Sequence, residues 1–355
     1  MRCCRAKTRR SRPLTSIKDV ATRAGVSLTT VSHTISGKRH VSANIKLRVE
    51  QAMDDLGYTP RRAAQSLASG RSRLIGLIVP DINNGFFSEL ASGVERAAIA
   101  RDYNVVLCTT GSDHTREMFY LETVRSRALD GVVYAAGAPP TDSELNRLLG
   151  DLPVTLVDED VKGSTAPAFV SDNYDGGRLA AEHLLSLGHT AAVVLTAADL
   201  ESSSQRSRGF REAWEAAQLP SPRVALGAFT AAGGRAAIEQ VLGALMAGES
   251  SAVFAVNDLM ALGAIERLDE AGLRTPEDIS IVGFDDTFIA RYSRPKLTTV
   301  HQDVIALGEK AATALIDSLD GIRQLMPAER HVLPVQLVVR SSTAAPPHMP
   351  RIRKD

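Results

Sequence analysis

The sequence predicts a small all-α helix-turn-helix head joined to a larger α/β body made of two doubly wound parallel-sheet subdomains. Three observations carry this prediction. Between residues 16 and 57, apolar residues recur at helical spacing after capping residues. From residue 73 onward, apolar runs alternate with amphipathic helices, and this alternation starts again near residue 191. At 355 residues, of which 44% are hydrophobic, the chain is long enough for two or three folded units.

The first helix of the head is predicted from a capping box. Ser16 can accept a hydrogen bond from a first-turn N–H, and Asp19, three residues later, can accept one from the N–H of Ser16. The apolar stripe of this helix consists of Ile17, Val20, Ala21 and Ala24. Gly25 then ends the helix, because glycine adopts the left-handed conformation without strain.

Two further helices complete the head. Ser27 is placed to cap a second helix over residues 28–35, in which Val31 and Ile35 face inward, and a third helix is expected over residues 42–57. The outward positions of the second helix are Leu28, Thr29, Ser32 and His33. In a helix-turn-helix, the second helix enters the DNA major groove, although a helical bundle without a DNA role would show the same pattern.

The charge distribution favours DNA binding. Residues 1–73 carry 16 Lys and Arg but 4 Asp and Glu, a net charge of +12, so the remainder carries −12 in a chain that is neutral overall. A basic head on an acidic body is typical of a protein whose head binds a polyanion.

Composition also excludes several classes of protein. The three cysteines, at positions 3, 4 and 108, are too few for a disulfide framework or a four-cysteine metal site, and we expect no metal and no cofactor. No stretch reaches the ~20 apolar residues of a membrane-spanning helix. No apolar run follows the basic N-terminus as it would in a secretory signal, so we expect a cytoplasmic protein with no membrane partner.

The body alternates short apolar runs with helical patterns. Predicted buried parallel strands cover residues 74–80, 105–109, 131–135, 154–158, 191–196, 224–226, 252–256 and 279–284. Predicted intervening helices of the first half cover residues 86–101, 115–128 and 142–149. Because ligands bind parallel sheets at the carboxyl ends of the strands, the loops that follow these strands are candidate ligand sites.

Those loops contain polar and aromatic residues suited to a small ligand. The candidates are Asp81, Asn83, Phe86, Phe87, Asp158, Arg206, Phe229, Asn257, Asp285 and Gln302. Carboxylates and amides can hydrogen-bond a polyol, the Arg206 guanidinium offers a planar fork of donors, and Phe229 offers an aromatic face to a sugar ring. Asn257 and Asp285 can equally cap the following helices, and residues 158–160 (DED) can equally form a solvated acidic loop.

Several ordered segments resemble the lactose-repressor (LacI/GalR) family of transcription regulators. In the head they are residues 16–21 (SIKDVA), 24–27 (AGVS), 30–32 (TVS), 41–42 (VS), 56–60 (LGYTP) and 63–67 (AAQSL). In the body they are residues 75–77 (IGL), 257–258 (ND), 283–286 (GFDD) and 297–299 (LTT). The resemblance spans roughly residues 15 to 345. It implies a sequence-specific repressor with a periplasmic-binding-protein-like body, whose operator affinity is controlled by an effector bound between two lobes.

For the head, the resemblance implies that Leu28, Thr29 and His33 read bases in the major groove. A leucine can contact a thymine methyl, a threonine can hydrogen-bond several bases, and a histidine can donate to guanine. The family more often has arginine where His33 stands, which leaves the preferred half-site open. The full predicted DNA-binding set is Ser16, Ser27, Leu28, Thr29, Thr30, Ser32, His33, Arg61, Ala64 and Leu67.

Residues 60–72 resemble the family's hinge, which becomes helical on operator DNA. The resemblance implies that Leu67 wedges between base pairs in the minor groove, with Ala64 packed beside it. Family members usually have asparagine where Arg61 stands.

For the body, the resemblance implies effector contacts from residues on both halves. Phe86 and Phe87 match ligand-stacking positions of purine-responsive members, whereas Gln302 is more typical of the sugar-responsive branch, so we expect a sugar. Many members have Asn-Pro where this chain has Asn84-Gly85. The full predicted effector-binding set is Asp81, Phe86, Phe87, Asp158, Arg206, Phe229, Asn257, Asp285 and Gln302.

The expected organisation has five parts. They are a disordered basic leader (1–14), a DNA-binding domain (15–59), a hinge (60–72), an effector-binding and dimerisation domain (73–345) and a tail (346–355). Within the body, subdomain N is expected over about 73–172 and 301–331, and subdomain C over about 173–300 and 332–345. The expected partners are double-stranded DNA with a pseudo-palindromic operator, a small-molecule effector and a second copy in a homodimer. No leucine heptad tail supports a tetramer.

Three other classes of protein fit the sequence less well. An enzyme is disfavoured, because the chain has no G-x-x-x-x-G-K-[ST], H-E-x-x-H or G-x-S-x-G motif. A periplasmic solute-binding protein would carry a secretory signal and no basic helix-turn-helix head. A nucleoid-type protein without a ligand would lack the polar and aromatic residues that gather after the strands of the body.

Overall fold

The computed structural model describes residues 15–36, 39–58, 71–126, 129–161, 163–198 and 200–347. The chain divides into two compact units, Met1–Arg73 and Leu74–Asp355. The basic leader, most of the hinge and the end of the tail lie outside the described residues, and so do Arg61, Ala64 and Leu67. Among the described helices, none has the length and hydrophobicity to cross a membrane.

The first unit contains the three helices α1 (Ile17–Ala24), α2 (Leu28–Ser36) and α3 (Ala43–Leu56). The predicted capping box is present, since the N–H of Ser16 donates to Asp19 Oδ2 at 2.8 Å and the N–H of Asp19 donates to Ser16 Oγ at 3.4 Å. Gly25 follows α1 with a left-handed φ of 64°. Ser27 begins α2 by accepting a hydrogen bond from the N–H of Thr30 at 3.1 Å. The buried residues of this small core are Val20, Ala21, Ala24, Val31, Val49 and Ala52.

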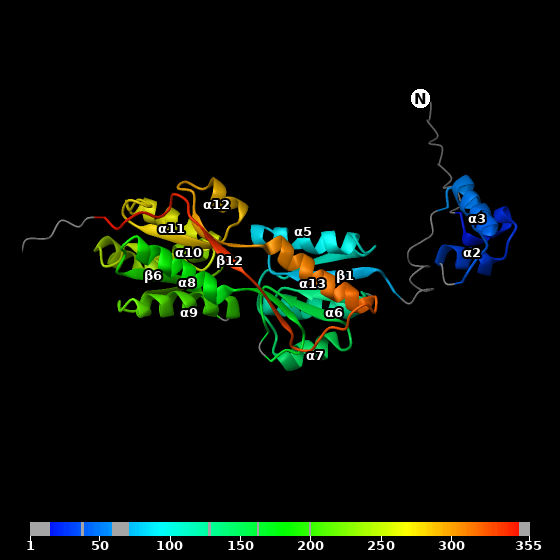
Figure 1. Cartoon of the computed structure of the whole chain (residues 1–355), viewed down its shortest axis with the longest axis horizontal. Coiled ribbons are helices and arrows are strands. Elements are labelled where there is room, and N and C mark those ends of the chain that lie inside the picture. Colours follow the sequence, from blue (N-terminus) through cyan, green and yellow to red (C-terminus); the bar gives the residue numbers. More distant parts are fainter. Residues whose placement is uncertain are drawn as a thin grey trace, which may run out of the picture. The chain divides into compact units, whose positions relative to one another are not determined.

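The second unit has two lobes, each built on a six-stranded sheet (Figure 1). The sheet of the first lobe has the strand order β11-β5-β4-β3-β1-β2 and is parallel throughout. Its strands are β1 (Leu74–Val79), β2 (Asn104–Thr109), β3 (Gly131–Tyr134), β4 (Val154–Val157), β5 (Ala168–Ser171) and β11 (Arg330–Leu333). Its helices are α5 (Gly85–Ile99), α6 (His114–Ser126), α7 (Asp142–Leu149) and α13 (Val304–Leu319). Two separate clusters of buried residues, one including α5 and α13 and the other α6 and α7, form its core.

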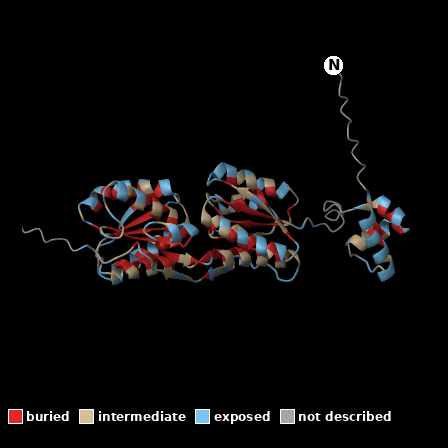
Figure 2. Ribbon diagram, turned by 90° about the horizontal axis from the view of Figure 1, so that it is seen from above, coloured by how far each residue is buried: buried red, intermediate tan, exposed pale blue. Residues whose placement is uncertain are grey.

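The second lobe repeats this architecture with the strand order β12-β10-β9-β8-β6-β7. Its strands are β6 (Ala192–Ala197), β7 (Arg223–Gly227), β8 (Ala252–Ala255), β9 (Ser280–Asp285), β10 (Thr298–Gln302) and β12 (Val335–Val338). Only β12 is antiparallel to its neighbour. Its helices are α8 (Asn173–Ser186), α9 (Glu201–Ala216), α10 (Ala231–Met246), α11 (Asp258–Glu270) and α12 (Phe288–Tyr292). The inner strands of both lobes are buried, whereas many residues of the outer helices and of the edge strands β2 and β7 are exposed or only partly buried (Figure 2).

The chain crosses between the lobes three times, after β5, β10 and β11. β10 continues through Gln302, which pairs with Val335 of β12, and β11 continues through Leu333. The last two crossings therefore fall about two residues later than the boundaries expected from the sequence, because strand pairing holds these residues in their sheets.

Close helix packing fixes α9, the helix that carries Arg206. An added Cβ at Gly177 of α8 would lie 2.0 Å from the carbonyl oxygen of Arg206, and one at Gly209 of α9 would lie 2.0 Å from that of Tyr174. Real Cβ atoms do not approach so closely, so these two glycines allow α8 and α9 to touch through their backbones.

Candidate functional site

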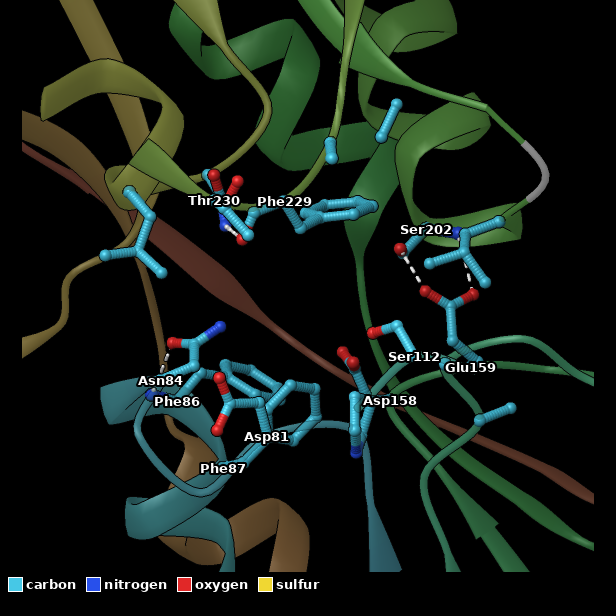
Figure 3. Close-up of a pocket in the computed structure, with 18 of the residues that line it drawn as sticks. Asp81, Asn84, Phe86, Phe87, Ser112, Asp158, Glu159, Ser202, Phe229 and Thr230 are labelled. Atoms are coloured by element: carbon cyan, nitrogen blue, oxygen red, sulfur yellow. Dashed lines mark hydrogen bonds between the residues drawn. The ribbon is translucent and has the colours of Figure 1, made fainter. Parts of the chain in front are cut away.

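A pocket of about 480 Å³ lies at the carboxyl ends of the strands of both sheets (Figure 3). Its polar lining comes from loops that follow strands and from the first turns of helices, as expected for doubly wound sheets. The polar residues that line it are Asp81, Asn84, Ser112, Asp158, Glu159, Ser202, Arg206, Thr230, Asn257 and Asp285. Three phenylalanines, Phe86, Phe87 and Phe229, line it as well.

On the side of the second lobe, Arg206 is held by a network of buried hydrogen bonds. Its Nε donates to Asn173 Oδ1 at 2.8 Å, and its Nη1 donates to the carbonyl oxygen of Val256 at 2.7 Å. Its guanidinium carbon lies 3.8 Å from the ring centroid of Phe284, which adds a cation–π contact. The side chain is 3% exposed, so it enters the pocket with a fixed orientation.

Asp285 completes this network. Its Oδ1 accepts hydrogen bonds from Arg206 Nη1 at 3.4 Å and from Gln302 Nε2 at 2.7 Å. Burial raises the pKa of Asp285 above its ordinary value, although the positive charge of Arg206 opposes the rise. Asp285 lines the pocket, and Thr287 rather than Asp285 is the N-cap residue of α12.

Asn257 has both of the roles that the sequence left open. Its Oδ1 accepts a hydrogen bond from the N–H of Met260 at 2.9 Å and so caps α11, and its Nδ2 donates to the carbonyl oxygen of Phe229 at 3.4 Å. It also lines the pocket. The cap therefore orients an amide that is available to a ligand.

Gln302 differs from its expected position. It is 1% exposed and does not belong to the pocket lining; it lies behind Asp285, to which it donates a hydrogen bond. β10 runs beside β9 with His301 opposite Asp285, which brings the amide of Gln302 within reach of that carboxylate. Gln302 therefore supports a pocket residue and does not face the pocket itself.

Behind Asp285, Asp258 fixes the segment that leads into α12. It accepts hydrogen bonds from Thr299 Oγ1 at 2.6 Å, from the N–H of Thr287 at 2.8 Å and from Thr287 Oγ1 at 3.0 Å. Burial raises the pKa of Asp258 to about 7, against the effect of these donors.

On the side of the first lobe, two phenylalanines face the pocket from the start of α5. Asn84 caps this helix by accepting a hydrogen bond from the N–H of Phe86 at 3.1 Å, so the turn at Asn84-Gly85 is ordered. The rings of Phe86 and Phe87 meet edge to face with their centroids 5.0 Å apart. Phe229 lies across the pocket from them (Figure 3).

Two carboxylates accompany these rings on the first lobe. Asp81 is exposed at the pocket rim, where its Oδ1 accepts a hydrogen bond from the N–H of Asn83 at 2.9 Å. Asp158 adopts a left-handed φ of 69° after β4 and points into the pocket (Figure 3). Burial raises the pKa of Asp158 to about 6, and Arg206 opposes this rise.

The burial of Glu159 contradicts the alternative prediction that residues 158–160 form a solvated acidic loop. It is 3% exposed and lines the pocket. It was missing from the predicted set, together with Asn84, Ser112, Ser202 and Thr230. Ser112 and Glu159 follow strands and Thr230 caps α10, so a stricter use of the carboxyl-end rule would have found these three.

In the first unit, the predicted recognition residues lie on α2. Leu28 is 47% exposed, Thr29 is exposed, and Ser32 and His33 are half-buried. Ser16 and Ser27 are hydrogen-bonded to Asp19 and Thr30 at the starts of α1 and α2. The inward residue Val31 is fully buried, so α2 presents an apolar side to the core and an exposed Leu28-Thr29 pair to solvent.

Comparison with known proteins identifies both units. Residues 16–61 match the model of bacterial regulatory proteins of the lacI family, and residues 181–343 match that of a periplasmic binding protein-like domain. The HTH-type transcriptional regulator DegA of Bacillus subtilis is 34% identical over 93% of this chain and 98% of its own.

Solved structures agree with this comparison. The lac repressor dimer bound to operator and the anti-inducer ONPF matches with a TM-score of 0.81 at 29% identity, over 93% of this chain and 99% of that chain. A LacI family transcriptional regulator from Enterococcus faecium with bound ribose matches with a TM-score of 0.68 at 33% identity, over 77% of this chain and 99% of that chain.

Proposed function

Because the chain belongs to the lacI family of bacterial regulatory proteins, and is therefore a DNA-binding transcription regulator rather than an enzyme, we propose that a sugar bound in the pocket controls its affinity for an operator. The sugar binds between the two lobes of the body. By favouring one angle between the lobes, it shifts the population of heads that are spaced to bind DNA.

The composition of the pocket is the observation that carries the choice of a sugar. Phe229 on one lobe and Phe87 on the other offer apolar faces to a ring, while carboxylates and an amide offer hydrogen-bond partners to its hydroxyls. The volume of about 480 Å³ suits a small ligand. The Enterococcus faecium relative with bound ribose shows that a sugar is bound in a protein of this fold and family.

The proposed effector contacts are those sequence-predicted residues that line the pocket. They are Asp81, Phe86, Phe87, Asp158, Arg206, Phe229, Asn257 and Asp285. Gln302 acts on the effector indirectly, through Asp285.

The proposed DNA contacts lie in the first unit and in the hinge. The exposed pair Leu28 and Thr29, with His33 on the same helix, reads the major groove, while Ser16, Ser27, Thr30 and Ser32 support the helix ends and contact the backbone. Arg61, Ala64 and Leu67, which lie outside the described residues, are proposed to act in the minor groove.

The proposed assembly is a homodimer that binds a pseudo-palindromic operator. A dimer supplies the two heads that two half-sites require, and the lac repressor structure that this chain resembles is a dimer. The edge strands β2 and β7 expose Leu107, Val224 and Leu226, which offers apolar surface to a second copy.

A ligand screen tests the choice of effector. We expect at least one monosaccharide in a panel of pentoses, hexoses, disaccharides and purine bases to raise the melting temperature of the full chain and to change its affinity for operator DNA. Stabilisation by purine bases alone would replace the sugar with a purine, which the adjacent rings of Phe86 and Phe87 would also stack.

A substitution in the hinge tests the DNA-binding proposal. Leu67→Ala should weaken operator binding far more than binding to random DNA, because an apolar wedge contributes only where the operator is bent. Fluorescence anisotropy with both DNAs measures the two affinities, and Leu47→Ala, an exposed leucine on α3, serves as the control. Equal losses on both DNAs would remove the wedge from the proposal.

A further inference from the structure

Glu159 and Ser202 connect the two lobes at the edge of the pocket (Figure 3). Glu159 follows β4 of the first lobe, and Ser202 lies in the first turn of α9 in the second lobe. The N–H of Ser202 donates to Glu159 Oε2 at 3.1 Å, and Ser202 Oγ donates to Glu159 Oε1. Both residues are no more than 4% exposed, so water competes little with this two-point contact.

The contact connects segments that carry proposed effector residues. Asp158 directly precedes Glu159, and Arg206 lies one helical turn after Ser202 on α9. Because Gly177 and Gly209 fix α9 against α8, α9 moves with its lobe. Separation of Glu159 from Ser202 would therefore move Asp158 away from Arg206.

We infer that Glu159 is a positioning residue of the effector pocket, which through Ser202 holds the two lobes in the arrangement where Asp158 and Arg206 face the same ligand. The inference rests on the proposed function, because it assigns to Glu159 a part in effector binding. It differs from that function in naming a residue that acts between the lobes and not on the sugar.

Glu159 can hold Ser202 in either protonation state. Burial, and then the neighbouring charge of Asp158, raise the pKa of Glu159 to about 8. The other charged groups around it are Arg206 and Glu201 on α9, and Asp160 with its ion-pair partner Arg330 at 3.3 Å.

A protonated carboxyl can donate to Ser202 Oγ while its other oxygen still accepts from the N–H of Ser202. Above about pH 8, Glu159 loses this proton and a second negative charge stands beside Asp158. The ionised carboxylate still accepts hydrogen bonds from both the N–H and the Oγ of Ser202, so the contact persists in either form.

Four variants of the full chain test the inference. Ser202→Ala, which removes one buried hydrogen bond, should lower sugar affinity about tenfold, and Glu159→Ala, which removes both, should lower it at least as much. The double variant should lose no more than Glu159→Ala alone, because Glu159→Ala already removes both hydrogen bonds, whereas Ser202→Ala keeps the one from the backbone N–H. Asp160→Asn is the matched control, since its ion pair with Arg330 stays within the first lobe, and we expect its affinity to change less than about twofold.

Two further measurements separate this role from ordinary structural support. Glu159→Gln, whose amide can accept from the N–H of Ser202 and donate to its Oγ, should leave sugar affinity nearly unchanged where Glu159→Ala lowers it. Hydrogen exchange in the absence of sugar should be faster at the N–H of Ser202 in Glu159→Ala than in the wild type and in Asp160→Asn.

The outcomes distinguish the inference from the proposed function. If no sugar binds the wild type, the choice of effector is wrong, and hydrogen exchange still decides the inference. Unchanged exchange at Ser202 in Glu159→Ala would overturn it, and so would sugar affinity that is equal in Glu159→Ala and the wild type, or single losses that simply add in the double variant.

Discussion

The two walls of the pocket come from lobes with matching strand order, yet they are built differently. On the wall of the second lobe, Arg206, Asn257 and Asp285 are each at most 6% exposed and are hydrogen-bonded to their own lobe. On the wall of the first lobe, Phe86 and Glu159 are buried, but Phe87 and Asp158 are only partly buried and Asp81 is exposed.

This difference indicates that the second wall provides a fixed geometry and the first wall sets ligand selectivity. Buried, hydrogen-bonded groups keep their geometry when the ligand leaves, so the second wall is preorganised. Partly exposed rings and carboxylates can adjust at low cost, so the first wall is the better place to change which ligand is bound. Substitutions should therefore affect stability on the second wall and selectivity on the first.

The largest effect is expected at Arg206. Arg206→Ala leaves Asp285 buried without its positive partner, which should lower the free energy of unfolding by about 3–5 kcal/mol and abolish effector binding. Urea denaturation and a sugar titration measure the two losses. Arg208→Ala, an exposed neighbour on α9, is the control and should retain both stability and binding. A stable Arg206→Ala variant would show that the second wall is not a preorganised network.

A smaller, pH-dependent effect is expected at Asp258, which supports the second wall. Its pKa in the folded state, about 7, lies above its ordinary value of 3.8, so the folded protein holds the proton more tightly. The stability that this proton provides is present below pH 4 and is lost as the pH rises through 7. Asp258→Asn should therefore gain stability relative to the wild type between pH 5 and pH 7.5, by on the order of 1–3 kcal/mol.

Denaturation curves at the two pH values measure this gain. Asp278→Asn is the control, because an ion pair with Arg274 lowers the pKa of Asp278 and keeps it ionised over the whole interval. An Asp258→Asn variant that differs from the wild type equally at both pH values would place the pH dependence elsewhere.

The smallest effect on stability is expected on the first wall, at Phe87. Phe87→Ala should lower sugar affinity about tenfold and change the ranking of sugars, because it removes one of the two opposed aromatic faces. The change in unfolding free energy should be smaller than for Arg206→Ala, since the ring is only partly buried. A full sugar panel with Phe87→Ala and Phe87→Leu, in parallel with denaturation, makes the measurement. A loss of stability as large as that of Arg206→Ala would contradict the different roles of the two walls.

The sequence alone was sufficient for the three helices of the head and for eight of the twelve described strands of the body, whereas β5, β10, β11 and β12 were not among the predicted strands. Ser16 and Asp19 form the predicted capping box, and the apolar runs from Leu74 onward form the predicted strands. These features depend on neighbours that are close in sequence, such as a cap three residues away or a run of β-branched side chains, so local pattern is enough to specify them.

The site was predicted only in part. Asn257 and Asp285 end strands and were found by that rule, whereas Glu159 was also read as part of a solvated loop and Gln302 was placed in the pocket. Burial of Glu159 depends on Ser202, 43 residues away in the other lobe. The position of Gln302 depends on the register of β10 against β9.

The sequence by itself determined the three helices of the head, most of the strands of the body, the opposite charges of head and body, and the residue types available to a ligand. The tertiary structure decided which of those residues share a pocket, which stand behind it, and which join the lobes. The reason is physical: a carboxyl group changes from a solvated surface charge to a buried, proton-holding contact only when distant segments remove its water.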